Sequence, residues 1–174
     1  MVHVYKADIT KLHVDAIVSA TNEQLCHGKG VAHAIASAAG QSLKEDADDY
    51  IRRHGPLKVT QVVVTNRGYL PCRRVLHAVG PRWYDYRNKA ECQQRLVDTV
   101  YHCLLKTDSR GFTSVALPSI SSGVVNAQFE FVKHTHTHTH THTHRHTHTH
   151  THTHTHTHTL SLTLSSVSVC LSLS

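Results

Sequence analysis

The sequence predicts one layered α/β domain within residues 1–124, and three observations lead to this prediction. Short segments rich in Val and Ile, bounded by polar residues or Gly, have the composition of strands. Longer segments between them carry apolar residues at helical spacing, as Leu96, Val100 and Leu104 do. Because the two kinds of segment alternate, we expect strands buried between helices, with functional loops at the carboxyl ends of the strands.

The predicted elements follow one another closely along the chain. Strands are predicted at Val2–Lys6, Ala16–Ala20, Gln61–Thr65, Val75–Val79 and Ser114–Leu117. Helices are predicted at Gly30–Ala39, Leu43–His54 and Ala90–Thr107. Gly40 and Gly55 are suited to end the first two helices, and Asn88 to cap the third. Ligand residues are therefore expected in the loops that follow strands: 21–31, 80–84 and 119–124.

Length and charge limit the classes of function. A chain of 174 residues is long enough for one domain. It holds 18 Lys and Arg against 12 Asp and Glu. One of the basic residues, Arg145, lies in the repeat described below, so residues 1–133 carry only a mild positive excess. This excess suits an anionic ligand, but no Lys/Arg run is dense enough to predict a nucleic-acid partner.

The five Cys residues are expected to be free thiols, because they are odd in number and irregularly spaced, with no CxxC pair. We expect no secretory leader ahead of the first strand. No run of about 18 apolar residues offers a membrane span, so no membrane partner is expected. These features predict a reducing compartment, the nucleus and/or the cytoplasm.

The composition changes abruptly after residue 133. Residues 134–159 alternate His and Thr, interrupted once by Arg145, and residues 160–174 are a Leu/Ser-rich tail. We predict that 134–159 is a disordered low-complexity segment, since it has no apolar face at either period. Residues 125–133 form an unassigned junction. Alternating His can chelate Zn²⁺, Ni²⁺ or Cu²⁺, so metal binding by the tract is kept as an alternative, but no metal site is predicted.

The same tail suggests an origin outside the domain. A CA dinucleotide repeat encodes His-Thr alternation, and a CT repeat encodes Leu-Ser alternation. Our hypothesis is that residues 160–174 are non-native read-through, past an exon boundary near Val124, so that 1–124 is a truncated domain. Sequencing the transcript across that boundary tests it, and a continuous spliced message containing the repeat would contradict it.

Two of the three loops have the features of an anion site. In loop 21–31, Gly28 and Gly30 allow a ligand to approach the backbone, and the start of the following helix offers unpaired amides. A tight turn into a packed helix explains the same pattern. Loop 119–124 consists of small residues with donor groups that can wrap a diphosphate, although a plain surface turn would look alike.

Five motifs taken together, in this order, resemble the macro domain family. They are Lys6–Thr10 (KADIT), Val14–Asn22 (VDAIVSATN), Gly28–Ala32 (GKGVA), Leu76–Trp83 (LHAVGPRW) and Leu117–Val124 (LPSISSGV). The details are closest to the first macro domain of vertebrate macro-domain-bearing ADP-ribosyltransferases. The resemblance implies a three-layer α/β/α fold with a mixed central sheet, incomplete at the carboxyl terminus. It also implies a module that binds ADP-ribose and mono- or poly-ADP-ribosylated proteins, with no cofactor.

The resemblance assigns roles to particular residues. Asp8 would accept a hydrogen bond from the adenine amino group, next to the amide of Ile9, although the carboxylate also suits a turn or helix cap. Asn22 would face the terminal ribose or close the turn after its strand. The backbones of Gly28, Gly30 and Val31 would line the diphosphate and the terminal ribose. The other side of the clamp would consist of Ser121, Ser122, Gly123 and Val124. We expect His77 in the core and Trp83 at the rim.

Three positions near the site depart from the family pattern. Ser19 stands where the family usually has Asn, and Thr21 where it has Ala, which changes the hydrogen bonding near the site. Lys29 replaces the central Gly of the loop. If that position needs a positive φ, Lys costs about 1–2 kcal/mol there, whereas its charge could pair with the diphosphate.

A fourth departure bears on catalysis. The best-known hydrolytic subfamily uses an Asp ten positions after the Asn equivalent to Asn22, where a carboxylate can orient water. Relatives without that Asp can cleave the bond by other means. Here that position is Ala32. We therefore predict no catalytic residues, and ADP-ribosyl-protein hydrolysis is kept as the alternative function.

Overall fold

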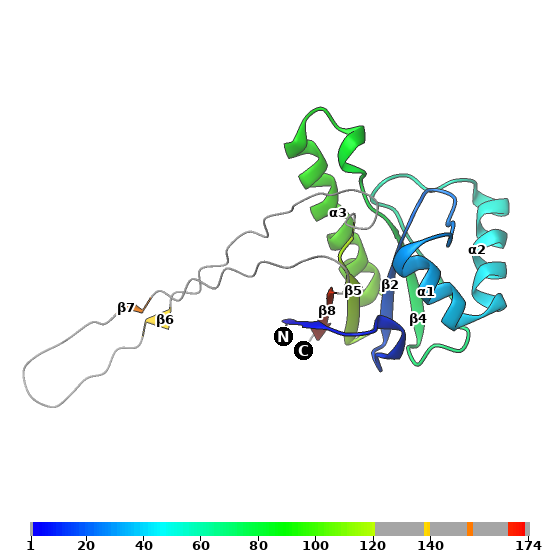
Figure 1. Cartoon of the computed structure of the whole chain (residues 1–174), viewed down its shortest axis with the longest axis horizontal. Helices are drawn as coiled ribbons and strands as arrows, with labels where there is room; N and C mark the ends of the chain where they lie inside the picture. Colours follow the sequence, from blue (N-terminus) through cyan, green and yellow to red (C-terminus); the bar gives the residue numbers. More distant parts are fainter. Residues whose placement is uncertain (1, 121–137, 140–152, 155–166, 173–174) are drawn as a thin grey trace, which may run out of the picture. The chain divides into compact units, whose positions relative to one another are not determined.

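The computed structural model describes residues 2–120, 138–139, 153–154 and 167–172 (Figure 1). The chain divides into two compact units. One comprises Met1–Ala127 with Leu164–Ser174, and the other Gln128–Thr163. The described part of the second unit is an antiparallel pairing of β6 (His138–Thr139) with β7 (Thr153–His154).

A six-stranded mixed sheet runs through the first unit in the order β1-β8-β5-β2-β4-β3. Its strands are β1 (Val2–Lys6), β2 (Ala16–Thr21), β3 (Val62–Thr65), β4 (Arg74–Val79), β5 (Ser114–Pro118) and β8 (Val167–Ser172). β2 pairs in parallel with both β4 and β5, whereas β3 and β8 run antiparallel to their neighbours. The mixed central sheet is therefore confirmed.

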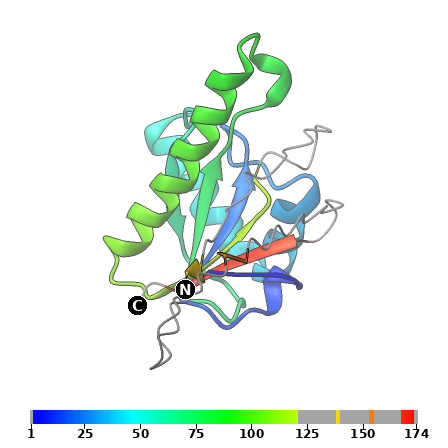
Figure 2. The ribbon, with the colours of Figure 1, turned by 90° about the vertical axis from the view of Figure 1, so that its left-hand side faces the viewer.

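Helices cover both faces of this sheet (Figures 1 and 2). α1 (Gly30–Ala39) and α2 (Gln41–His54) pack on one face, and α3 (Lys89–Asp108) on the other. The strands alternate accordingly: Ile17 and Val75 belong to the α1/α2 side, while Val18 and Leu76 belong to the α3 side. This period of two, with helices on both faces of the sheet, is the three-layer arrangement that was expected.

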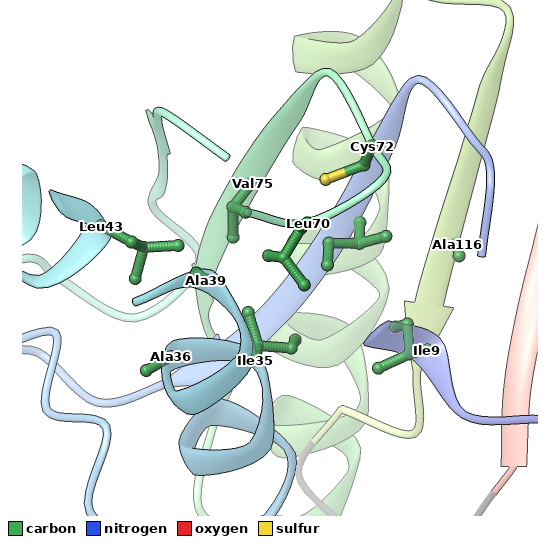
Figure 3. Packing of buried hydrophobic residues seen from close by; sticks show 10 residues of the cluster. Ile9, Ile35, Ala36, Ala39, Leu43, Leu70, Cys72, Val75 and Ala116 are labelled. Carbon is green, nitrogen blue, oxygen red and sulfur yellow. The ribbon is translucent and has the colours of Figure 1, made fainter. Parts of the chain in front are cut away.

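The apolar cluster on the α1/α2 side joins distant parts of the chain (Figure 3). Ile35 of α1 and Leu43 of α2 are fully buried and lie among residues of the strands. Ile9, 5% exposed, brings the short 3-10 helix η1 (Ile9–Lys11) into the same cluster. The core thus fixes where η1 lies relative to α1.

The predicted helix ends are confirmed. Gly40 and Gly55 follow α1 and α2 with φ of 84° and 75°, and their amides donate to Ala36 and Ile51. Both residues adopt the left-handed region that favours Gly at a helix end. The Asn88 side chain accepts a hydrogen bond from the amide of Ala90 and caps α3.

Part of the carboxyl-terminal tail pairs with the sheet. β8 lies between β1 and β5 and pairs antiparallel with both. Its sequence has Val167, Val169 and Leu171 at a period of two, which is the spacing of a strand. The read-through hypothesis for residues 160–174 stays a prediction. The other expected boundaries, at 125–133 and 134–159, fall largely outside the described residues and stay predictions.

One residue, Asp15, joins the amino ends of three strands through its carboxylate and its backbone carbonyl. Asp15 precedes β2, and its Oδ2 accepts hydrogen bonds from the amide and hydroxyl of Thr113 at 2.8 and 2.9 Å. Its backbone carbonyl accepts from the amides of Arg73 and Arg74, at the start of β4. The Thr113 amide is the leading cause that lowers the pKa of the Asp15 carboxyl. The charged form is therefore the one that the fold stabilises.

His77 is confirmed as a core residue. It lies on β4 with no exposed surface, and its Nε2 lies 2.8 Å from the hydroxyl of Thr65 on β3. Burial lowers its pKa from the ordinary 6.5 to about 3, with a smaller contribution from His27. The imidazole therefore stays neutral in the folded protein at neutral and mildly acidic pH.

We predict that Gly68→Ala strongly destabilises the fold. Gly68 has a φ of 56°, and a Cβ there would overlap the carbonyl oxygen of Ala39. That oxygen also accepts a hydrogen bond from the amide of Tyr69. We expect urea unfolding to show a loss of about 3 kcal/mol or more. The matched control is Gly111→Ala, which shares a positive φ, 64°, but meets no atom within 4 Å, so about 1 kcal/mol is expected. Equal losses would contradict a specific overlap.

We predict that His77 makes the fold less stable as the pH falls. Below 6.5 the unfolded chain takes up a proton at this residue, whereas the folded protein does not until about pH 3. The free energy of unfolding should therefore fall by up to about 1.4 kcal/mol per pH unit within that window.

Urea unfolding at pH 7, 6 and 5 tests this. His77→Phe should show a shallower slope, while Thr99→Val, which removes a fully buried hydroxyl without a titrating group, should keep the slope of the wild type. Parallel slopes for wild type and His77→Phe would show that the prediction is wrong.

Candidate ligand-binding site

Loops that were predicted to carry the site follow the parallel strands. The ligand loop, residues 22–29, follows β2, and residues 80–88 follow β4. Loop 119–124 follows β5, but the structure describes it only to Ile120. Because β2, β4 and β5 run in the same direction, their carboxyl ends lie at one edge of the sheet.

The ligand loop is folded by its own polar contacts. Asn22 Oδ1 accepts hydrogen bonds from the amides of Gln24 and Cys26 at 3.2 and 2.9 Å. The Thr21 hydroxyl donates to the Cys26 carbonyl at 3.2 Å. Leu25 takes a φ of 55° and buries its side chain, which is 2% exposed. Asn22 therefore closes the turn after its strand, which was the alternative role expected for it.

The same contacts orient the amide of Asn22. Because Oδ1 faces the two backbone donors, Nδ2 is directed away from the turn, and among the described residues it has no acceptor. Asn22 is itself exposed. One side chain can thus shape the loop through its oxygen and offer a donor to a ligand through its nitrogen.

Neighbouring segments also hold the ligand loop. The Leu57 amide donates to the Glu23 carbonyl at 2.8 Å. The Glu23 carboxylate lies 3.6 Å from Arg82 in the loop after β4, and Asp85 also contacts Arg82, at 2.8 Å. Sequence reasoning did not identify the Glu23–Arg82 pair, although both residues lie in or beside loops that it singled out. An exposed pair of this kind contributes about 0–1 kcal/mol to stability.

The amino end of α1 presents backbone donors that have no partner among the described residues. Gly30, Val31 and Ala32 form its first turn, and the His33 amide is the first to find a carbonyl within the helix region, that of Lys29 at 3.4 Å. Val31 is 39% exposed. A Cβ at Gly28 or Gly30 would meet nothing within 4 Å, so no described residue fills the space in front of either glycine.

Lys29 carries no backbone strain. Its φ and ψ are −148° and 161°, which is extended backbone, so the conditional cost of 1–2 kcal/mol does not arise. The positive φ falls on Gly30 instead, at 63°. Lys29 stands at the cap position of α1 without a side-chain hydrogen bond to the helix.

Asp8 acts as a helix cap in the structure. Its Oδ1 accepts from the amide and hydroxyl of Thr10 at 3.0 and 2.7 Å, and these bonds lower its pKa. The cap alternative is confirmed, and the exposed carboxylate keeps Oδ2 outside these bonds. The next residue, Ile9, is the first of η1, which packs against α1.

The structure thus brings most of the expected residues toward α1. Asn22, Gly28, Gly30 and Val31 belong to the loop and the first turn, while Asp8 and Ile9 are held beside α1 by η1. The remaining expected residues, Ser121, Ser122, Gly123 and Val124, lie outside the described residues. Trp83 is half-buried on η2 (Trp83–Asp85), in keeping with a place at the rim.

Other expectations concern thiols, metals and membranes. Cys26, Cys72, Cys92 and Cys103 are free thiols, and burial raises the pKa of Cys103 to about 12. Within the described segments, no group of three or more His, Cys, Asp or Glu is placed to hold a metal ion. None of the described helices has the length and apolar character needed to cross a membrane.

Comparisons with curated proteins find relatives of several kinds. An uncharacterized protein of Saccharolobus solfataricus is 39% identical over 129 residues, 74% of this chain and 70% of that protein. The O-acetyl-ADP-ribose deacetylase of Escherichia fergusonii is 41% identical over 123 residues, 71% of this chain and 68% of that protein. Human protein mono-ADP-ribosyltransferase PARP14 is 39% identical over 121 residues, 70% of this chain but 7% of PARP14.

Solved structures show the same fold. The Oceanobacillus iheyensis macrodomain with MES bound has a TM-score of 0.65 and 28% identity, and the match covers 71% of this chain and 72% of that one. A mutant of that macrodomain with ADPR has a TM-score of 0.64 and 31% identity, covering 68% and 64% of the two chains.

The extent of these matches bounds the conclusion. The matched part spans about two thirds of the length of four uncharacterized relatives, from 65% to 70%. The family model described as Macro domain matches residues 18–136, which is more than half of the chain. Together with the three-layer fold and the loop geometry, this match shows that the chain belongs to the macro domain family.

Proposed function

We propose that this chain binds ADP-ribose at the carboxyl ends of the parallel strands. The ligand loop and the first turn of α1 form the site. The observation that carries the proposal is the open space before Gly28 and Gly30, next to the unpaired amides of the first turn of α1. Backbone donors at a helix amino end bind a diphosphate with a favourable dipole. The solved macrodomain with ADPR, 31% identical, supports the same ligand.

Two side chains supply contacts to the ends of the ligand. The Asp8 carboxylate, with Oδ1 used by the cap, offers Oδ2 to the adenine amino group, and the Ile9 amide lies beside it. Asn22 offers Nδ2 to the terminal ribose. Lys29, whose extended backbone costs nothing, adds a positive charge close to the diphosphate. Ser121, Ser122, Gly123 and Val124 would close the clamp.

The biological ligand is then ADP-ribose attached to protein. Similarity to PARP14 at 39% identity supports a module that recognises mono- or poly-ADP-ribosylated proteins. The exposed Val31 and the open loop leave room for a ligand that continues into a protein side chain. We propose the nucleus and/or the cytoplasm as the location, where such modified proteins occur together with free thiols.

Hydrolysis is the second candidate, because the Escherichia fergusonii relative is an O-acetyl-ADP-ribose deacetylase. Ala32 lies in the first turn of α1, 4% exposed, and its methyl group cannot orient water. Binding without turnover is therefore the better account of this chain.

We predict that Gly28→Val abolishes or strongly weakens binding while leaving the fold intact. Gly28 has no left-handed φ, and a Cβ there meets no protein atom, so the new side chain would fill only the ligand space. Calorimetric titration of the full chain with ADP-ribose should show at least a tenfold loss of affinity, about 1.4 kcal/mol.

The control for this prediction is Gly111→Ala. Gly111 also has open space before its Cβ but follows α3, so it should keep the wild-type affinity despite its positive φ. No binding of ADP-ribose by the wild-type chain would contradict the proposed function. Equal affinity of Gly28→Val and the wild type would place the ligand elsewhere.

We predict that the wild-type chain releases no ADP-ribose from a mono-ADP-ribosylated protein, because Ala32 has no carboxylate to orient water. Ala32→Asp should gain measurable release if its carboxylate reaches the bound linkage. Chromatography of freed ADP-ribose checks both proteins, with Ala38→Asp, on the exposed side of α1, as the matched control. Release by the wild-type chain would favour the hydrolase alternative.

A further inference from the structure

Three buried polar atoms lie beneath the ligand loop without a hydrogen-bond partner. They are Ser19 Oγ, His27 Nε2 and His77 Nδ1, the orphaned side-chain atoms among the described residues. Ser19 and His77 have no exposed surface at all. Buried polar groups are nearly always hydrogen-bonded, and those without a protein partner usually bind an internal water.

The three atoms come from three separate segments that meet on one face of the sheet. Ser19 of β2 and His77 of β4 are direct partners in the parallel register, so their side chains point to the same side. That side is the one covered by α1 and α2, since Ile17 and Val75 lie two residues before them. The His27 ring, from the ligand loop, stands edge-on to His77 with centroids 5.3 Å apart.

The described hydrogen bond of the His77 ring uses Nε2 and leaves Nδ1 without a partner. Nε2 lies 2.8 Å from the Thr65 hydroxyl oxygen, which also lies 3.2 Å from the Asn66 carbonyl. Whichever ring nitrogen carries the proton, Nδ1 is a buried donor or a buried acceptor. It needs a partner that the described protein atoms do not supply.

We propose that Ser19 Oγ, His27 Nε2 and His77 Nδ1 bind one ordered water molecule, which joins the ligand loop to the sheet. A water has two donor and two acceptor sites, so it can pair with His77 Nδ1 in either tautomer of the ring. Its remaining sites serve His27 Nε2 and the Ser19 hydroxyl, which can donate or accept. Three protein partners are the usual number for a buried water.

The site has a consequence for ligand binding. His27 directly precedes Gly28, so its ring position sets where the backbone before the open space lies. The loop's side-chain ion pair, Glu23 with Arg82, is exposed and weak, whereas the water link is buried. Ser19, His27 and His77 are thus positioning residues for the ligand loop. This consequence rests on the proposed function, whereas the water site itself does not.

A crystal structure of the full chain at high resolution tests the site directly. The expected result is a water within about 2.7–3.2 Å of all three atoms. Absence of a water there, or a direct hydrogen bond between Ser19 and His77 in its place, would overturn the proposal. This experiment needs no ADP-ribose, so its outcome is independent of the proposed function.

Two variants test the role in positioning. His27→Phe keeps an aromatic ring against His77 but removes Nε2, and Ser19→Ala removes the hydroxyl without adding volume. Calorimetric titration should show ADP-ribose affinity about three- to tenfold lower in both. The matched control is Thr107→Val, which removes a fully buried hydroxyl on α3, bonded to the Cys103 carbonyl on the other side of the sheet.

The control separates positioning from a general loss of stability. Thr107→Val should lower the midpoint of thermal unfolding and keep the wild-type affinity. Wild-type affinity in both His27→Phe and Ser19→Ala would overturn the positioning role. If the wild-type chain binds no ADP-ribose, the proposed function fails and the crystal structure alone decides the water site.

Discussion

The arrangement of the site depends on the hydrogen bonds made by Asp15. Its carboxylate and its peptide group hold the amino ends of β2, β4 and β5 together, through Thr113, Ser114, Arg73 and Arg74. Three parallel strands that begin at one point, and pair in a fixed register, also end near one another. Asp15, at the amino ends of these strands, thereby places the ligand loop and the loop after β4 together at their carboxyl ends.

The ligand edge is organised by a different principle. Side chains there shape the backbone with some of their atoms and leave others for a ligand: Asp8 caps η1 through Oδ1, and Asn22 closes its turn through Oδ1. Local hydrogen bonds of this kind hold the site in shape before a ligand arrives, which reduces the entropy lost on binding. The two interpretations of each residue, structural and ligand-binding, are therefore compatible rather than exclusive.

Much of this could be predicted from the sequence because its signals are local. The Val/Ile runs, the helical spacing and the glycines at 40 and 55 each act over a few residues, and the structure places all the predicted helices and strands within a few residues of expectation. The family motifs, taken in their order along the chain, also predicted which loops bind the ligand. Strain at Lys29 was expected only if its φ were positive. In the structure the positive φ lies one residue later, at Gly30.

What the sequence could not show depends on contacts between distant segments. Nothing near Ser19 indicates that it faces His77, which is 58 residues away, or that His27 completes a polar cluster beneath the loop. The position of β8 is a similar case. A segment such as Val167–Ser172 is a weak signal by itself, yet without β8 the facing edges of β1 and β5 would lack hydrogen-bond partners. The place of β8 therefore depends on strand pairing and register with segments about 50 residues or more away. The only trace of this in the sequence is the period of two within the strand itself.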